Sequence, residues 1–170
     1  MTSLLIAAAT LIAVVLIMLG EAARSSFNER LLRARGARDV PDGVLGTMQW
    51  AYPVSFAAMA IEGALSGPST PELLPIGLAV FGVSKALKIW TISALGMRWT
   101  FRILVMPDAP LVTHGPYAFT RHPNYIAVLG EMIGVALIVW APVTGVLAFV
   151  GYGALLRQKI AVEDRALGRQ

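Results

Sequence analysis

The sequence predicts an all-α integral membrane protein with five transmembrane helices. Three observations support this fold class. Hydrophobic residues make up 56% of the 170-residue chain and charged residues only 14%, whereas about 25% of the residues in soluble domains are charged. The mean hydropathy is +0.68. Apolar runs that approach the roughly 20 helical residues needed to cross a bilayer recur along the chain. We therefore expect one multi-pass membrane domain over residues 1–170.

The apolar runs and the polar segments between them define the expected elements. We expect spans at about residues 3–22, 44–65, 73–95, 125–141 and 143–157. The first span lacks a preceding basic segment and a good cleavage site, so we expect a retained helix rather than a signal peptide. Pro53 should kink the second span. The link at Pro142 is so short that the last two spans must form a helical hairpin.

Polar segments separate these spans. The segment after the first span is basic and contains Leu31 and Leu32, which predicts a helix that leaves the membrane and lies in its interface. A long polar connection over residues 96–124 precedes the fourth span. A charged tail at residues 157–170 follows the fifth span and is expected to be helical through Leu167.

The basic residues are distributed asymmetrically. Five lie in the first connection, three in the third and four in the tail, while the second and fourth connections have none. Five spans place twelve of the 14 basic residues on one side of the membrane. The positive-inside rule then places this side in the cytoplasm and the N-terminus outside, in the cell (inner) membrane. The net charge of +4 thus follows from topology and does not indicate nucleic-acid binding.

The residue counts also limit the chemistry. The chain has no cysteine, which excludes disulfides, thiolate zinc sites, iron–sulfur clusters and a cysteine nucleophile. It has only two histidines. We therefore expect no protein-bound metal.

The passage Leu111–Tyr125 is the long polar passage between apolar runs in the C-terminal half. It contains both histidines, two tyrosines and two prolines. Pro123 is typical of a helix start, and the free N–H groups there, together with Arg121 and His122, suit an anionic group such as a carboxylate. The tyrosine rings suit a planar ring or a cation. The alternative is a belt of side chains at headgroup level that binds nothing.

Charged residues also occur inside the expected spans. Glu131 lies about two turns into the fourth span, where an ionisable group usually has a partner or faces a cavity. Lys85 or Lys88 of the third span could be this partner, and both a structural ion pair and a ligand-binding role remain open. Glu62, near the outer end of the second span, is expected to reach the membrane interface.

The tail offers a second set of polar side chains: Arg157, Lys159, Glu163 and Asp164. A solvated helix end would explain them equally well in isolation. Because the hairpin brings the tail close to the polar connection on the same side of the membrane, we expect loop and tail to share one site.

Three motifs in this order resemble the isoprenylcysteine carboxyl methyltransferase family of integral-membrane enzymes. They are Gly115-Pro116-Tyr117, Arg121-His122-Pro123-Asn124-Tyr125, and Glu163-Asp164 before Leu167. Further segments are similar to the small bacterial branch that methylates the alkylpyrone products of type III polyketide synthases. These segments are Asn28–Arg30, Arg35–Ala37, Leu95–Ile103 and Pro107–Val112. The resemblance extends from about Glu21 to the end of the chain.

The resemblance implies an O-methyltransferase that uses S-adenosylmethionine and acts on a membrane-dissolved, lipid-like anionic acceptor, with its active site facing the cytoplasm. An alkylpyrone-type polyketide is the leading acceptor, and a carboxylate of isoprenylcysteine or a related prenylated substrate is the alternative. The implied cofactor contacts are Pro110, Leu111, Val112, His114, Gly115, Tyr117, His122, Pro123, Asn124, Tyr125 and Glu163. The implied catalytic residues are Arg157, Glu163 and Arg121, and the implied acceptor contacts are Arg157, Arg98 and Trp99.

Two positions depart from the family pattern. Ala127 stands where many members have glycine, and Asp164 replaces the second of two glutamates, so either acid could be the functional one. Two other functions are considered. A nicotinamide-dependent membrane reductase would share a similar C-terminal architecture, although the chain lacks a glycine-rich dinucleotide motif. A non-enzymatic membrane scaffold would not depend on the polar side chains.

Overall fold

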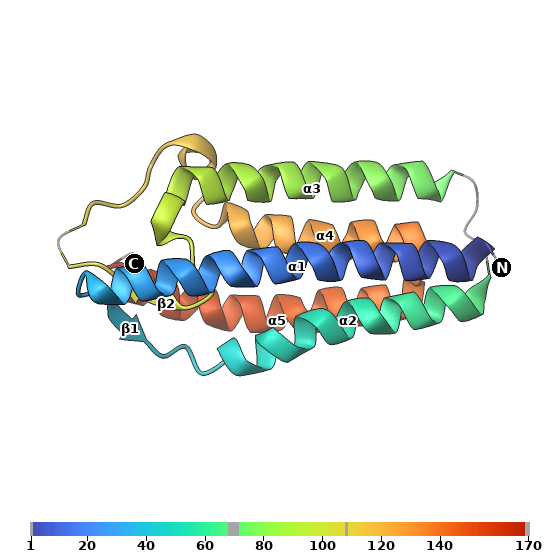
Figure 1. The fold of residues 1–170 in the computed structure, drawn as a ribbon, viewed down its shortest axis with the longest axis horizontal. Helices are drawn as coiled ribbons and strands as arrows, with labels where there is room; N and C mark the ends of the chain where they lie inside the picture. Colours follow the sequence, from blue (N-terminus) through green and yellow to red (C-terminus); the bar gives the residue numbers. More distant parts are fainter. Residues whose placement is uncertain (1, 68–71, 108, 169–170) are drawn as a thin grey trace.

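The computed structural model describes residues 2–67, 72–107 and 109–168, and five α-helices lie side by side along its long axis (Figure 1). The helices are α1 Thr2–Ala34, α2 Leu45–Ser66, α3 Leu73–Leu95, α4 Pro123–Val139 and α5 Pro142–Ala166. The short elements are the strands β1 Arg38–Val40 and β2 Ile103–Val105 and the 3-10 helices η1 Gly96–Arg98 and η2 Gly115–Ala118. Residues 68–71 of the expected second connection and Arg169 of the tail lie outside the described residues.

The all-helical class is confirmed, and three helices have the length and composition of membrane spans. These are Thr2–Ala34, Leu73–Arg98 and Pro142–Ala166. The apolar α4, Pro123–Val139, is shorter, at 17 residues. The α2 helix continues through Pro53 and packs in the same bundle. The expected third span, residues 73–95, coincides with α3.

The expected interfacial helix is instead the end of α1. This helix runs without a break for 33 residues, because no proline interrupts it and its single glycine, Gly20, is tolerated inside a helix. Gly36, with φ of +85°, follows the helix end, and the chain then enters β1. The antiparallel pairing of β1 with β2, which the sequence did not predict, joins Arg38 to Val105.

The α3 and α4 helices pack at backbone distance. A Cβ atom added to Gly134 would lie 2.7 Å from the backbone nitrogen of Phe81, and one added to Gly77 would lie 2.7 Å from that of Ile138. Small residues permit such close approach between helices in a membrane. These glycines therefore fix the spacing between the two helices that flank the long polar connection.

The α4 and α5 helices form the expected hairpin. Trp140, in the left-handed conformation with φ of +58°, ends α4, and α5 begins at Pro142. Glu62 accepts hydrogen bonds from the backbone N–H groups of Val143 (3.0 Å) and Thr144 (2.7 Å). The carboxylate of Glu62 therefore binds the free N–H groups at the start of α5, in addition to lying near the end of its own helix.

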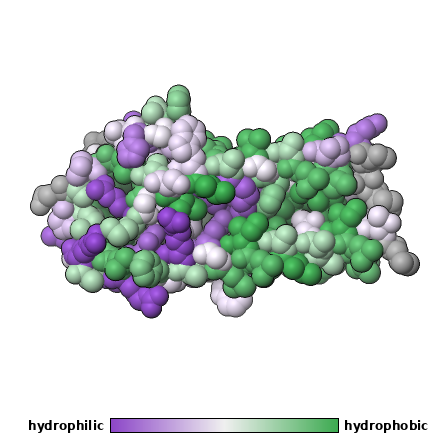
Figure 2. Space-filling view, turned by 45° about the horizontal axis from the view of Figure 1, so that its top comes forward, coloured by the Kyte–Doolittle hydropathy of each residue, from purple (hydrophilic) through white to green (hydrophobic). Residues whose placement is uncertain are grey.

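The polar segments gather at one end of the bundle. In Figure 1 the sheet, the connection from α3 to α4 and the C-terminus lie at the left, opposite the N-terminus. Figure 2 shows mostly hydrophilic residues at this end and mostly hydrophobic residues over the rest of the visible face. We call this end of the bundle the polar end.

Candidate active site

A cavity of about 760 Å³ opens at the polar end. All five helices and the connection between α3 and α4 contribute to its wall. Its polar lining includes Glu21, Tyr52, Lys88, Arg98, Tyr117, Arg121, His122, Asn124, Tyr125, Lys159 and Glu163. Its apolar lining includes Met18, Met48, Val128 and Leu156. The cavity is therefore amphipathic, and it lies where the expected loop and tail meet.

The start of α4 is clasped to the end of α5. The Tyr125 hydroxyl donates a hydrogen bond of 2.6 Å to Glu163 Oε2. His122 Nε2 lies 3.2 Å from Asp164 Oδ1, and the His122 ring stacks on Tyr125 with centroids 5.5 Å apart. Both acids thus contact the loop, but only Glu163 lines the cavity. Asp164 instead positions His122.

Lys159 joins three segments around the cavity. Its ammonium donates to Asp42 Oδ2 at 2.7 Å and to the carbonyl oxygen of Phe101 at 2.8 Å. The other oxygen of Asp42 accepts from the N–H groups of Val44 (3.0 Å) and Leu45 (2.8 Å) at the start of α2. Only 6% of the Lys159 side chain and 3% of the Asp42 side chain are exposed.

The charge state of Asp42 follows from these contacts. Burial alone would raise the pKa of the Asp42 carboxyl, but the hydrogen bond and charge of Lys159 and the two backbone N–H groups lower this pKa below its ordinary value. Asp42 is therefore an anion at neutral pH, and the pair with Lys159 is ionic.

The C-terminal part of α1 holds the connection after α3. Asn28 donates to the carbonyl oxygen of Trp99 at 2.8 Å, and Ser25 Oγ accepts from the N–H of Phe101 at 2.8 Å. The Trp99 indole N–H in turn donates to Asn124 Oδ1 at 3.2 Å. Trp99 is 3% exposed, so it links α1 to α4 from the inside of the protein.

Arg98 and Arg121 are two of the three arginines among the described residues that line the cavity. Arg98 Nη1 donates to the carbonyl oxygen of Pro110 at 2.5 Å, which holds the segment Pro110–Val112 along the wall. Arg121 is exposed and makes no ion pair or hydrogen bond with the residues that the structure describes. Its guanidinium is therefore available for an anionic group.

Arg157 is an expected site residue that lies outside this arrangement. Its side chain is exposed and does not line the cavity. Lys159 lies two residues later, roughly 200° around the helix, and does line it. The sequence could have indicated this, because Lys159 is four residues before Glu163 and residues at this spacing share a helix face.

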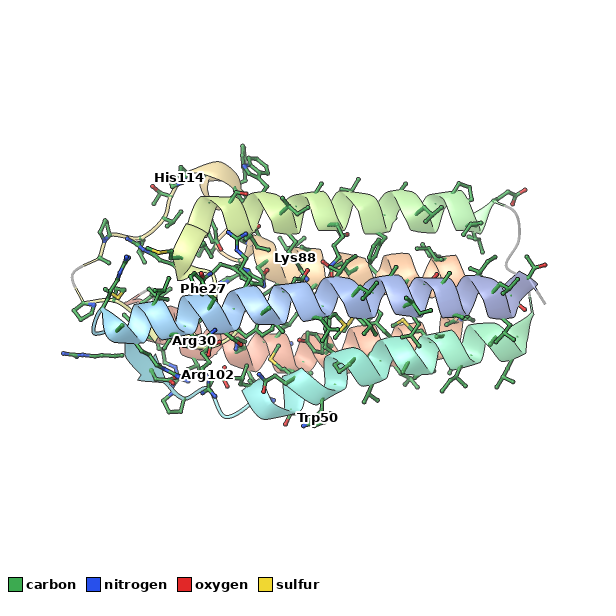
Figure 3. The ribbon with its side chains drawn as sticks, viewed as in Figure 1. Phe27, Arg30, Trp50, Lys88, Arg102 and His114 are labelled. Carbon is green, nitrogen blue, oxygen red and sulfur yellow. The ribbon has the colours of Figure 1, made fainter. Side chains whose placement is uncertain are left out.

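Three other expected cofactor contacts lie outside the lining of the cavity. Figure 3 shows His114 at the outer edge of the loop, and His114 is exposed. Gly115 has φ of +62°, and a Cβ atom there would lie 3.1 Å from the Cβ of Ala94, so it packs η2 against α3. Pro123 is buried at the first turn of α4. None of the three is among the residues that line the cavity.

The ionisable residues inside the bundle form one cluster. Glu131 pairs with both lysines: it lies 3.1 Å from Lys85 and 2.9 Å from Lys88. The sequence left open which of the two would be the partner. Both lysines also bind Glu21 of α1, at 2.9 Å and 3.1 Å, a partner that sequence reasoning missed although Glu21 directly follows the first apolar run.

The loop and the tail that form this site lie within the part of the chain that a family sequence model recognises. The model of the isoprenylcysteine carboxyl methyltransferase (ICMT) family matches residues 76–169, which is more than half of the chain. The chain belongs to the ICMT family. Membership and the apolar helices together make it a multi-pass membrane protein, and membership supports a membrane methyltransferase as its class.

Two curated relatives are similar over most of the chain. "Uncharacterized protein YpbQ" of Bacillus subtilis (strain 168) is 30% identical over 141 residues, which cover 82% of this chain and 83% of the relative. An "Uncharacterized protein" of Haemophilus influenzae (strain ATCC 51907 / DSM 11121 / KW20 / Rd) is 26% identical over 141 residues, 82% of each chain. No solved structure matches significantly.

The ICMT match divides the cavity into two parts. It includes α4, α5 and nearly all of α3, and therefore the clasp of Tyr125 to Glu163. It excludes α1 and α2. Glu21 and Tyr52, which line the inner end of the cavity, therefore lie outside the segment that identifies the family.

Proposed function

We propose that this protein transfers a methyl group from S-adenosylmethionine to an oxygen atom of a membrane-dissolved, lipid-like anionic acceptor. An alkylpyrone-type polyketide is the acceptor that we favour. The observation that supports the proposal best is the amphipathic cavity, which joins the family's polar motifs to apolar side chains of the bundle. Such a cavity suits a polar cofactor and a lipid-like partner at the same time.

The residues at the rim fit S-adenosylmethionine. The cavity volume of about 760 Å³ falls within the roughly 300–1,000 Å³ of typical ligand pockets. The carboxylate of Glu163 and the ring of Tyr125 suit a cationic group, and the guanidinium of Arg121 suits a carboxylate. We therefore assign cofactor binding to Pro110–Val112, Tyr117, Arg121, His122, Asn124, Tyr125 and Glu163.

The proposed reaction requires positioning more than acid–base chemistry. S-adenosylmethionine supplies a methyl group on a positively charged sulfur; the carbon–sulfur bond breaks as a carbon–oxygen bond forms. An acceptor that is already an anion needs no general base, and the positive and negative charges disappear together. Fixing two reactants in line can lower a barrier by about 7–11 kcal/mol. The clasp of Tyr125 to Glu163 holds the cofactor side of the cavity in place.

On the acceptor side, Arg98 and Trp99 are the proposed contacts that line the cavity. Trp99 is fixed by Asn28 and Asn124, so its ring offers a rigid wall. The acceptor contact of Arg157 has no such support, because this side chain is exposed and does not line the cavity. We therefore expect Arg157 to affect methyl transfer less than Arg98.

We further propose that all five helices cross the cell (inner) membrane and that the polar end faces the cytoplasm. The twelve basic residues in the first connection, the third connection and the tail support this orientation. The same orientation gives the cofactor site access to the compartment in which S-adenosylmethionine is made.

A methyl-transfer assay tests the proposal. Purified protein in lipid nanodiscs is incubated with a bacterial lipid extract and S-adenosylmethionine carrying a labelled methyl group, and the products are identified by mass spectrometry. We expect label in a hydrophobic product with wild type, and strongly reduced label with Glu163→Gln. Glu62→Gln, the same change at the opposite end of the bundle, should retain activity. Absence of labelled product with folded wild type, or equal loss in both variants, contradicts the proposal.

The family description supports the carboxylate of isoprenylcysteine as a second candidate acceptor. The same assay distinguishes the two acceptors when a long-chain hydroxypyrone and N-acetyl-S-farnesylcysteine compete at equal concentration. We expect the pyrone to receive most of the label. Preferential methylation of the farnesylated cysteine would replace the leading candidate with the alternative.

A further inference from the structure

Five polar side chains meet inside the bundle, away from its polar end. They are Glu21 of α1, Tyr52 of α2, Lys85 and Lys88 of α3, and Glu131 of α4, and we call them the buried charge cluster. Lys88 lies seven residues before the end of α3, which is roughly 10 Å along the helix. Figure 3 shows Lys88 between α3 and α1, in the interior of the bundle.

The cluster is densely connected. Lys85 binds Glu21 at 2.9 Å and Glu131 at 3.1 Å. Lys88 donates to Glu131 at 2.9 Å, to Glu21 at 3.1 Å and to the Tyr52 hydroxyl at 3.4 Å. The Tyr52 hydroxyl donates to Glu131. Two ammonium groups and two carboxylates balance, so the cluster carries no net charge.

Helix cross-linking alone does not explain such a cluster. Buried ion pairs often contribute little net stability compared with apolar residues of the same size, and ionisable residues at membrane depth usually serve binding or transport. The side chains of Lys88 and Glu131 are only 3% and 1% exposed. Charges at this depth therefore suggest a role that an apolar core could not fill.

The cluster forms part of the cavity wall. Glu21, Tyr52 and Lys88 line the cavity, whereas Lys85 and Glu131 lie behind them. Figure 2 shows hydrophilic residues extending from the polar end into the mostly hydrophobic part of the same face. At this depth the cavity wall therefore offers a cation, a hydroxyl and a carboxylate beside apolar side chains.

One contact in this wall is weak enough to be exchanged. The Lys88 ammonium lies 2.9 Å from Glu131 and 3.1 Å from Glu21, and its contact with the Tyr52 hydroxyl is the longest of the three, at 3.4 Å. An oxygen atom of a ligand could accept this hydrogen bond in place of Tyr52. Met18, Met48 and Val128 line the same cavity and suit the alkyl part of such a ligand.

We propose that Lys88 and Tyr52 form a subsite that binds an oxygen atom on the ring of the acceptor, which selects a flat, oxygen-bearing ring with an alkyl chain. This inference rests on the proposed function, because it assigns the inner end of the same cavity to the acceptor. A branched hydrocarbon tail would exclude water from Lys88 and Tyr52 but could not form hydrogen bonds with them. Covering polar groups in this way costs free energy. The subsite therefore disfavours a prenyl tail in this position.

Lys85 offers a matched control for this subsite. It pairs with the same two glutamates as Lys88 but does not line the cavity. Lys85→Met and Lys88→Met therefore remove the same charge from the same cluster, and only the second removes a group that a ligand could contact. Tyr52→Phe removes a hydroxyl from the wall and leaves all four ion pairs in place.

The test is equilibrium binding of a long-chain 4-hydroxy-2-pyrone to purified protein in nanodiscs, measured by calorimetry in the presence of S-adenosylhomocysteine. S-adenosylmethionine is titrated separately into each protein. We expect Lys88→Met and Tyr52→Phe to weaken pyrone binding about tenfold or more, relative to Lys85→Met. We expect cofactor affinity within about threefold of wild type in each variant.

The outcomes separate the two proposals. Wild type that does not bind S-adenosylmethionine contradicts the proposed function. Wild type that binds the cofactor but not the pyrone overturns the subsite, as does equal weakening in the Lys85 and Lys88 variants together with unchanged binding in Tyr52→Phe. If Lys88→Met does not fold, Tyr52→Phe decides alone, because it keeps the ion pairs.

Discussion

Replacement of Lys159 by methionine removes one partner of a buried ion pair. Asp42 would keep two backbone N–H groups but lose the only cation that contacts it within the described residues. Breaking a buried pair in this way typically costs about 3–5 kcal/mol. Because Asp42 keeps its two backbone N–H partners, we expect a loss at the lower limit of this range, about 3 kcal/mol. For a chain of this size that corresponds to roughly 6–12 °C in Tm.

The effect should depend on pH. The folded-state pKa of Asp42 is lowered below its ordinary value, so the stability that the pair contributes is fully present above the unfolded-state pKa of about 3.9. This contribution is lost as the pH falls through the lower, folded-state pKa. In Lys159→Met the ammonium no longer opposes the effect of burial on the Asp42 carboxyl. The pKa of Asp42 in this variant is therefore higher than in wild type. The difference in stability between wild type and variant should therefore narrow as the pH falls below about 5.

Thermal unfolding in nanodiscs, followed by circular dichroism between pH 3 and pH 7, measures both effects. The double variant Asp42→Asn, Lys159→Met should be more stable than Lys159→Met at neutral pH, because it leaves no unpaired buried charge. A Lys159→Met variant as stable as wild type would contradict the ionic pairing. So would a double variant whose loss of stability equals the sum of the losses in Asp42→Asn and Lys159→Met.

Three further predictions concern the clasp, the hairpin and the α3–α4 contact. Tyr125→Phe removes the hydrogen bond to Glu163, which is worth about 1.5–3 kcal/mol, so S-adenosylmethionine should bind about tenfold or more weakly by calorimetry; unchanged affinity would exclude a role for the clasp. Glu62→Ala should lower the free energy of unfolding by about 1 kcal/mol, because it leaves the N–H groups at the start of α5 unbound, and a change in cofactor affinity would contradict this purely structural role. Gly134→Ala should lower the free energy of unfolding by about 1–3 kcal/mol, because the added Cβ atom overpacks the α3–α4 contact. Gly151→Ala should be tolerated, because nothing lies within 4 Å of the Cβ atom added there. Equal Tm values for the two variants would show that the close packing is absent.

The helices could be predicted because polar and turn-forming residues separate the apolar runs. The bounds of α3 match the expected span, and α5 continues to Ala166 as the helix-forming tail indicates. The end of α1 differs from the expectation because a change from apolar to charged residues does not by itself end a helix, and residues 24–34 contain neither glycine nor proline. The sheet of β1 and β2 depends on long-range pairing between two three-residue segments, for which local sequence has little signal.

The site could be predicted only in part, for a physical reason that α5 illustrates. Tyr152, Leu156, Lys159 and Glu163 follow one another at intervals of four, three and four residues and all line the cavity. Arg157 does not belong to this stripe. The resemblance to family motifs indicated Glu163. The helical period of α5 indicates that Lys159, and not Arg157, is the cation on the same helix face as Glu163. The partners of Lys85 and Lys88 depend on which helices are neighbours, which the sequence did not specify for α1.

Titration of S-adenosylmethionine into folded wild-type protein in nanodiscs tests most directly whether loop and tail enclose a cofactor site. We expect saturable binding at one site per chain, displaced by S-adenosylhomocysteine and weakened in Glu163→Gln but not in Glu62→Gln. No measurable binding at millimolar cofactor, or binding that both variants weaken equally, would contradict the assignment of this cavity to a methyltransferase.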